Sequence, residues 1–196
     1  MTMPILGWMV AAYLIGSIPV GLLISKTTGG IDPRKGGSRN IGATNVLRTV
    51  GKKAALFTLV GDLLKGLLPV AGARWFGLSE EVVLFTGFAV ILGHLFPIFL
   101  RLKGGKGVAT SFGVFLILAP SIALISLLIW IVGFYLSKYS SVGALSAFGA
   151  LPFVVFLLKS DIKLTLFASI ISILVYIRHK ENIRRLIAGR EERAHR

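Results

Sequence analysis

Residues 103–111 read Lys-Gly-Gly-Lys-Gly-Val-Ala-Thr-Ser, so a glycine-rich segment with lysines runs directly into an apolar stretch. Glycine lets the backbone approach a ligand without a side chain in the way. The N-terminus of the helix that follows offers unpaired N–H groups and a partial positive charge. Together they predict an anion site suited to phosphate. The candidate ligand-binding residues are Gly104, Gly105, Lys106, Gly107 and Thr110.

A second polar segment lies between residues 26 and 53, where residues 36–45 are dense in small hydrogen-bonding side chains. A solvated loop of turn-forming residues is one interpretation. The other is a site for a polyol phosphate, in which Arg48 holds the phosphate. The residues that would bind its hydroxyl groups are Ser38, Asn40, Thr44 and Asn45.

Three ionisable residues occur inside apolar stretches and need partners there. Asp62 and Lys65 are spaced i, i+3, which places them on one helix face and predicts an ion pair. His94 precedes a proline and is interpreted either as a hydrogen-bonded packing residue or as a functional one.

Further candidates lie in the last third of the chain. Ser140 and Ser141 follow Lys138 at the start of an apolar stretch, where they could serve as a helix cap. Residues 178–186 form a basic segment suited to anionic lipid. That role explains the arginines, but it does not require His179 and Asn182, which share a helix face at i, i+3.

Several chemistries are missing from the sequence. The chain has no cysteine, which excludes disulfides and thiolate sites, and no His/Asp/Glu cluster has metal-ligand spacing. There is no Gly-x-Ser-x-Gly elbow and no Walker-type nucleotide loop. Neither His94 nor His179 has an aspartate five residues later, so the His-x4-Asp pattern of acyl-CoA-dependent glycerolipid acyltransferases is absent. We expect no metal and no cofactor.

The composition is that of an integral membrane protein. Of 196 residues, 55% are hydrophobic and 15% charged, and the mean hydropathy is +0.82. The net charge is +14, and the basic residues lie mainly between apolar segments. In a membrane protein this pattern reflects topology and contact with anionic lipid, not nucleic-acid binding. Residues 1–25 carry no charge and predict an uncleaved spanning helix. We expect one membrane-embedded domain over residues 1–196.

The positive-inside rule predicts the topology. Seven basic residues in 26–53 and seven more in 178–196 should all be cytoplasmic. An odd number of crossings satisfies this rule if the fourth apolar segment breaks at Pro120, where a proline ends or kinks a helix. The expected fold is an all-α bundle of seven transmembrane helices, some short, with the N-terminus outside and the C-terminus cytoplasmic. The apolar segments are 4–25, 54–76, 82–100, 107–137, 142–158 and 164–177.

Three segments, in order along nearly the whole chain, resemble the PlsY family of bacterial acyl-phosphate:glycerol-3-phosphate acyltransferases. They are residues 38–45 (Ser-Arg-Asn-Ile-Gly-Ala-Thr-Asn), residues 93–97 (Gly-His-Leu-Phe-Pro) running on to 103–110, and residues 178–183 (Arg-His-Lys-Glu-Asn-Ile). Each motif alone is weak, but three in register are specific. The resemblance implies seven membrane helices with the N-terminus outside, in agreement with the charge pattern.

The resemblance also implies an activity, namely transfer of a fatty acyl group from acyl phosphate to the 1-hydroxyl of glycerol 3-phosphate. The products would be lysophosphatidic acid and phosphate, at the cytoplasmic side of the bacterial inner membrane, as the first acylation of phospholipid synthesis. A soluble enzyme would supply the acyl phosphate. The family's functional residues fall on Ser38, Arg48, Lys106, Ser141, His179 and Asn182.

Acyl phosphate is already activated, so we expect no covalent intermediate; a phosphate oxygen of the donor could take the hydroxyl proton. The hypothesis is that the glycine-rich loop and Lys106 hold acyl phosphate, whereas Ser38 and Arg48 help hold glycerol 3-phosphate. His179 and Asn182 would orient phosphate or the attacking hydroxyl. The main alternative is a transporter of phosphate-like anions, which also use broken helices, and a third is a lipid-binding membrane subunit.

Overall fold

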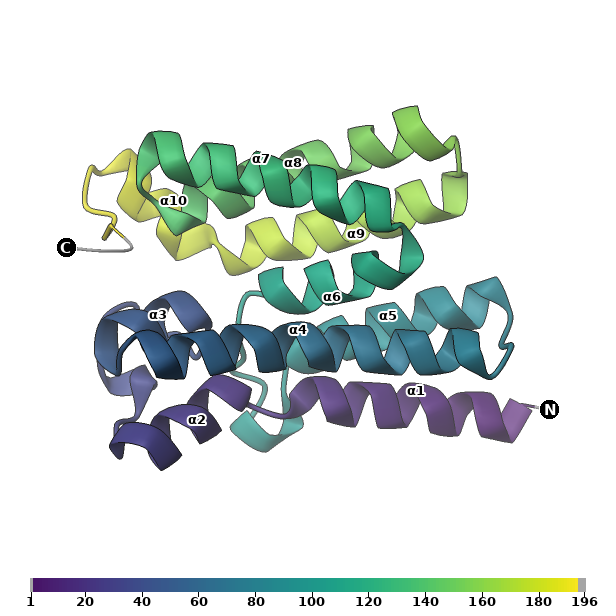
Figure 1. Ribbon diagram of the computed structural model, residues 1–196, viewed down its shortest axis with the longest axis horizontal. Coiled ribbons are helices and arrows are strands. Elements are labelled where there is room, and N and C mark those ends of the chain that lie inside the picture. Colours follow the sequence, from purple (N-terminus) through teal and green to yellow (C-terminus); the bar gives the residue numbers. More distant parts are fainter. Residues whose placement is uncertain (1, 194–196) are drawn as a thin grey trace. The chain divides into compact units, whose positions relative to one another are not determined.

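The computed structural model describes the backbone of residues 2–193 and the side chains of residues 5–193. Met1 and residues 194–196, the end of the basic tail, lie outside the described part. Every regular element within it is helical, which confirms the predicted all-α fold (Figure 1). The helices cluster into two compact units, Met1–Leu118 and Ala119–Arg196. The expectation of one domain stays a prediction.

The first unit is built around α4 (Lys52–Trp75), which contacts the other α-helices of the unit. The unit also has two short 3₁₀ helices, in the segments before α3 and α6. The remaining elements are α1 (Thr2–Ser17), α2 (Val20–Gly29), η1 (Pro33–Lys35), α3 (Ala43–Thr49), α5 (Glu80–Leu95), η2 (Ile98–Leu100) and α6 (Val108–Leu118).

Glycines allow the helices of this unit to approach closely. A Cβ atom added at Gly16 would lie 2.1 Å from the Val90 carbonyl oxygen, across the contact between α1 and α5. A Cβ atom at Gly113 would lie 2.1 Å from the Leu63 carbonyl oxygen, across the contact between α4 and α6. Small residues at such contacts are typical of helix packing in membranes, where backbone approach replaces the hydrophobic driving force.

In the second unit, α8 packs against both α7 and α9, and α10 contacts α9. The chain bends by 59° between α9 and α10, at His179. The elements are α7 (Pro120–Ser137), α8 (Ser140–Lys159), α9 (Ile162–Arg178) and α10 (Lys180–Ile187).

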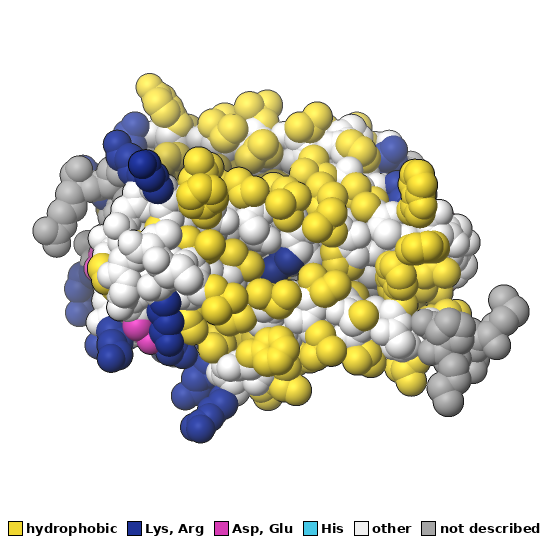
Figure 2. Space-filling view, turned by 60° about the horizontal axis from the view of Figure 1, so that its bottom comes forward, with side chains coloured by type: hydrophobic (Ala, Val, Ile, Leu, Met, Phe, Trp, Pro, Cys, Tyr) yellow, Lys and Arg dark blue, Asp and Glu magenta, His cyan; other side chains and the backbone are white. Residues whose placement is uncertain are grey.

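The outer surface of the helices is apolar. Large side chains such as Leu68 (59% exposed) on α4 and Phe153 (70%) on α8 point away from the packed interior. Figure 2 shows hydrophobic side chains covering much of the face in view. Such a surface is costly in water and favourable in lipid. The protein is therefore an integral membrane protein, as its composition predicted.

The first apolar segment forms two helices instead of the single one predicted. Residues Ile5–Gly29 are long enough to cross a membrane as one span, but Pro19 interrupts the helical hydrogen bonds between α1 and α2. The carbonyl of Ile18 at the break accepts a hydrogen bond from Lys65 Nζ, at 2.8 Å. This carbonyl also accepts from the N–H of Val20 at 3.0 Å, so a lysine of α4 adds a second hydrogen bond at the break within the span.

The predicted break at Pro120 is confirmed, because α6 ends at Leu118 and α7 begins with the proline. Arg74 donates hydrogen bonds to the carbonyls of Ile117 and Leu118, so that an arginine caps the C-terminus of α6. With 11 residues, α6 is only about 16 Å long.

Among the described residues, five helices or helix pairs are long and apolar enough to cross a membrane, and six if the bent pair α9–α10 counts as one. The count of seven includes the short α6. That count, and the orientation of the termini, stay predictions.

Candidate active site

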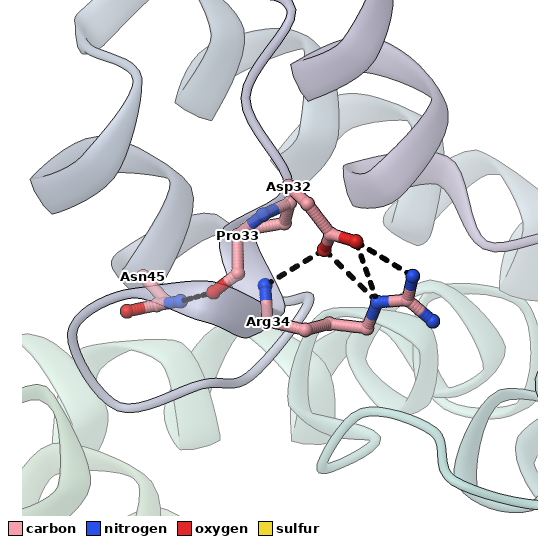
Figure 3. A network of polar contacts seen from close by, with 4 residues as sticks. All are labelled: Asp32, Pro33, Arg34 and Asn45. Atoms are coloured by element: carbon pink, nitrogen blue, oxygen red, sulfur yellow. Dashed lines mark hydrogen bonds and ion pairs between the residues drawn. The ribbon is translucent and has the colours of Figure 1, made fainter.

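The polar loop between α2 and α3 is organised by the side chain of Asn45. Its Nδ2 donates to the carbonyl oxygen of Pro33 at 2.7 Å (Figure 3). It also donates to the carbonyl oxygen of Asn40 at 2.8 Å, and Oδ1 accepts from the backbone N–H of Ser38 at 2.9 Å. Only 2% of Asn45 is exposed. This residue was predicted to bind substrate; in the structure its amide fixes the backbone that carries Ser38.

The other candidate residues of this region lie around the turn that leads into α3. The Oδ1 of Asn40 accepts from the N–H of Gly42 at 2.8 Å, directly before α3 begins. Thr44 lies in the first turn of α3 and Arg48 in its last, and both are half-buried, as is Ser38. The local sequence therefore builds a tight loop that leads into a short helix, and the two together carry these candidates.

An ion pair fixes the start of the loop. Asp32 caps η1 by accepting from the Arg34 N–H, and its carboxylate forms a two-pronged contact with the Arg34 guanidinium, with Nη2 and Oδ2 2.6 Å apart (Figure 3). This hydrogen bonding is the main cause that lowers the pKa of Asp32 to about 2, and the nearby Lys26 contributes. Asp32 is therefore ionised at neutral pH and part of the loop's positive charge is neutralised.

The glycine-rich loop, residues 103–107, lies against the end of α5. The N–H of Gly105 donates to the carbonyl of His94 at 3.1 Å. A Cβ atom at Gly104 would lie 2.2 Å from that carbonyl oxygen, and one at Gly105 would lie 2.1 Å from Nε2 of the His94 ring. These two glycines are required for packing against His94, a reason that the sequence did not show.

Lys106 is placed between this contact and the start of α6. Gly107 has a φ of +85°, in the left-handed region that favours glycine, and its carbonyl accepts the first helical bond of α6, from the N–H of Ser111 at 2.8 Å. The amides of Val108 to Thr110 are thus in the first turn, where helical N–H groups have no partner within the helix. The half-buried Lys106 adjoins a helix terminus of the kind that binds phosphate.

A buried polar cluster lies next to this loop. Nζ of Lys65 is 2.9 Å from Oδ1 of Asp62, which confirms the predicted ion pair. Nδ1 of His94 lies 3.6 Å from the same carboxylate oxygen and 3.1 Å from Oγ1 of Thr110. All four residues are buried. Thr110, predicted to bind substrate, has its hydroxyl directed to His94, so α4, α5 and α6 meet in one network.

In the second unit, Glu191 gathers the predicted site residues. Its Oε1 accepts from Ser141 Oγ at 2.8 Å and from Asn182 Nδ2 at 2.6 Å, and its Oε2 accepts from Arg185 Nε at 2.7 Å. Sequence reasoning missed Glu191, although an acid nine residues after Asn182 in a basic tail was a usable signal. Burial raises the pKa of Glu191, but these hydrogen bonds outweigh it and hold the pKa below its usual range.

His179 forms the bend between α9 and α10 and is 2% exposed. Its Nδ1 lies 2.8 Å from the carbonyl oxygen of Val175, which can only accept, so Nδ1 carries a proton. In the neutral ring, Nε2 is then the basic nitrogen. The structure thus brings Ser141 and Asn182 together on one carboxylate, with the ring of His179 fixed at the start of the same short helix.

Known proteins are similar to this chain in sequence and in fold. The family described as glycerol-3-phosphate acyltransferase matches residues 6–189. Similar proteins include the glycerol-3-phosphate acyltransferases of Methylobacillus flagellatus, 49% identical over 94% of both chains, and Geotalea daltonii, 48% identical over 93% of both.

Among solved structures, a crystal structure of PlsY, an integral membrane glycerol 3-phosphate acyltransferase, is similar with a TM-score of 0.91 and 41% identity. The match covers 97% of this chain and 95% of that one. That structure is described as the glycerol 3-phosphate form, and a lysophosphatidic acid form matches with a TM-score of 0.87.

Proposed function

This chain belongs to the glycerol-3-phosphate acyltransferase family, and we propose that it uses acyl phosphate as the donor and acylates the 1-hydroxyl of glycerol 3-phosphate. The products are lysophosphatidic acid and inorganic phosphate. The observation that carries the proposal is the glycine-rich loop, in which Lys106 adjoins the N-terminus of α6, an arrangement suited to holding a phosphate. The relative solved in glycerol 3-phosphate and lysophosphatidic acid forms supports the acceptor and the product.

The reaction needs little beyond positioning. The 1-hydroxyl oxygen attacks the carbonyl carbon of the donor, the bond from that carbon to the phosphate oxygen breaks, and the proton ends on the departing phosphate. Because phosphate is already a good leaving group, no nucleophilic side chain is required. Holding two substrates in reactive geometry supplies about 7–11 kcal/mol of a barrier. Their mutual repulsion is offset by the positive charge of the site.

The candidate residues divide between two tasks. Lys106, Arg48 and Ser38 hold phosphate groups, assisted by the glycine-rich loop and by the polar loop that Asn40 and Asn45 shape. Thr44, in the first turn of α3, adjoins this loop. His179 and Asn182, with Ser141, orient phosphate or the attacking hydroxyl. The carboxylate of Glu191 supports this second group by holding Ser141 and Asn182 through one oxygen.

The cellular setting follows from the charge pattern. We place the chain in the bacterial inner membrane as a multi-pass protein with the N-terminus outside, because the segments that carry the candidate residues are basic. The active site then faces the cytoplasm, where glycerol 3-phosphate and a soluble enzyme that makes acyl phosphate are available.

A donor comparison tests the proposal. Purified protein in detergent receives glycerol 3-phosphate with either palmitoyl phosphate or palmitoyl-CoA, and lysophosphatidic acid is measured by mass spectrometry. We expect product from palmitoyl phosphate and none from palmitoyl-CoA, because the loop recognises a phosphate close to the acyl carbonyl. Product from palmitoyl-CoA alone would show that the donor is wrong. Uptake of phosphate into vesicles without any product would indicate a transporter.

A further inference from the structure

His94 lies against the glycine-rich loop and contacts residues that precede and follow Lys106 in the sequence. Before Lys106, the Gly105 N–H donates to the His94 carbonyl at 3.1 Å, and a Cβ atom at Gly105 would be 2.1 Å from Nε2. After Lys106, Oγ1 of Thr110 is 3.1 Å from Nδ1. His94, at the end of α5, therefore contacts both ends of the short segment that carries the lysine, through its backbone carbonyl and its ring.

Asp62 of α4 lies beside the ring and is itself paired with Lys65. Oδ1 of Asp62 lies 3.6 Å from Nδ1 of His94 and 2.9 Å from Nζ of Lys65, which also donates to the carbonyl of Ile18. Side chains of Asp62 and Lys65 are both 5% exposed. Ionisable groups buried within a membrane protein are costly unless they are paired. The ring therefore has a fixed, charged support that reaches back to the break in the first span.

The start of α6 is packed closely against α4. A Cβ atom at Gly66 would lie 2.1 Å from the Thr110 carbonyl oxygen, so the two backbones are already in contact. Both anchors of the segment 105–110 are thus fixed by packing, one on α5 and one on α4. The position of Lys106 between these two anchors depends on the His94 ring, which packs against Gly105.

We propose that His94 is a positioning residue that holds the glycine-rich loop, and with it Lys106, where the loop takes the phosphate of a substrate. The identity of that ligand rests on the proposed function, whereas the placement of the loop is a property of the chain itself. His94 is 4% exposed and is enclosed by Gly105, Thr110 and Asp62. It therefore acts through Lys106 and not on the substrate.

Two substitutions and their combination test this inference. His94→Asn keeps an amide group near the place of Nδ1 and removes the ring edge that faces Gly105. Gly105→Ala inserts a methyl group where that edge lies. Each alone displaces the loop, and a displacement of about 1 Å costs roughly 100-fold in kcat/KM. In the double variant the methyl group enters the space vacated by the ring edge, whose atoms Nε2 and Cε1 had been 2.1 and 2.8 Å from it.

We therefore expect the double variant to be no worse than either single variant, instead of showing the product of two losses. Losses that multiply would overturn the inference. Thr86→Val is the matched control, because Thr86 is a buried residue of α5 whose hydroxyl donates to the Val82 carbonyl at 2.7 Å, within its own helix. Its kcat/KM should remain within about twofold of the wild type.

Hydrogen exchange provides a readout that does not depend on activity. In His94→Asn, amides of residues 104–110 should exchange about tenfold faster, while those of α7 to α9 keep their rates. Unchanged exchange in 104–110 would overturn the inference even if activity falls. If the wild-type chain transfers no acyl group, the proposed function fails, and hydrogen exchange still decides whether His94 holds the loop.

A second variant guards against misfolding of His94→Asn. Thr110→Val removes the hydroxyl that contacts Nδ1 and keeps the shape of the side chain, whereas Thr110→Ser keeps the hydroxyl. Faster exchange of 104–110 in the valine variant, with near-normal exchange in the serine variant, supports the network. Equal exchange in both variants would contradict it.

Discussion

Replacing Glu191 by glutamine should remove at least one of the hydrogen bonds that join Ser141, Asn182 and Arg185, while the side chain keeps its shape. The carboxylate accepts three hydrogen bonds, two at Oε1 from Ser141 and Asn182 and one at Oε2 from Arg185. A glutamine has one accepting oxygen and one donating nitrogen. Whichever way the amide is turned, its nitrogen faces a donor that has lost its acceptor.

The cost follows from the bond that is lost. A hydrogen bond to a charged group contributes about 1.5–3 kcal/mol, and we take the lower value because the Arg185 side chain is 34% exposed. This corresponds to about a tenfold smaller population of the ordered tail. We expect kcat/KM for acyl transfer to fall about tenfold in Glu191→Gln, with the melting temperature of the helical bundle almost unchanged.

The matched control is Glu181→Gln in the same short helix. Its pair with Arg184 has a distance of 2.9 Å, but the two side chains are 73% and 56% exposed, and such surface pairs contribute about 0–1 kcal/mol. Activity should change by less than about twofold. Equal effects in Glu181→Gln and Glu191→Gln would refute the role given to the buried carboxylate.

The Glu191 carboxylate should also make the stability of the tail depend on pH. Because the folded chain lowers the pKa of Glu191, the ionised carboxylate stabilises the tail fully above the unfolded value near 4.5. That contribution is lost as the pH falls through the lower folded pKa. Hydrogen exchange of residues 180–191 should therefore accelerate in acid in the wild type relative to Glu191→Gln. The same acid response in both proteins would contradict the assignment.

Three further outcomes are expected. Gly107→Ala should destabilise the loop by about 1–2 kcal/mol, because φ at this position is +85°. It should raise KM for the substrate whose phosphate the loop holds, and KM measured for both substrates shows which one that is. Asp62→Asn should lower the melting temperature strongly, since it leaves Lys65 without its buried anion, a loss of about 3–5 kcal/mol. In this cysteine-free chain, Ser121→Cys should react with an impermeant reagent from outside and Arg190→Cys from inside only, and outside labelling of Arg190→Cys would refute the seven-span topology.

Local features of the fold were predictable from sequence. The helix break at Pro120 follows from proline chemistry, and the pair of Asp62 and Lys65 follows from their spacing on one helix. The break before Pro19 was missed, because the apolar run around it is continuous and length alone indicated one span. What stabilises that break is Lys65, which is distant in sequence.

The packing roles of Gly105, His94 and Glu191 were not predictable either, because their partners are also distant in sequence. Gly105 was expected to make room for a ligand, but the structure shows that a side chain there would strike His94. The partners of His94 come from α4 and α6, and Glu191 joins residues of α8 and α10. Spacing within one helix indicates a shared face; it does not indicate which side chains of other helices meet that face.

The most direct measurement of the central claim is the joint yield of phosphate and lysophosphatidic acid from palmitoyl phosphate and glycerol 3-phosphate. It compares wild type, Lys106→Ala and the control Lys103→Ala, whose side chain is exposed in the same loop. The wild type and Lys103→Ala should each release phosphate and lysophosphatidic acid in equal amounts. The central claim predicts a loss of at least about 100-fold in Lys106→Ala, with an unchanged melting temperature. Normal yield from Lys106→Ala, or phosphate release without lysophosphatidic acid from the wild type, would contradict it.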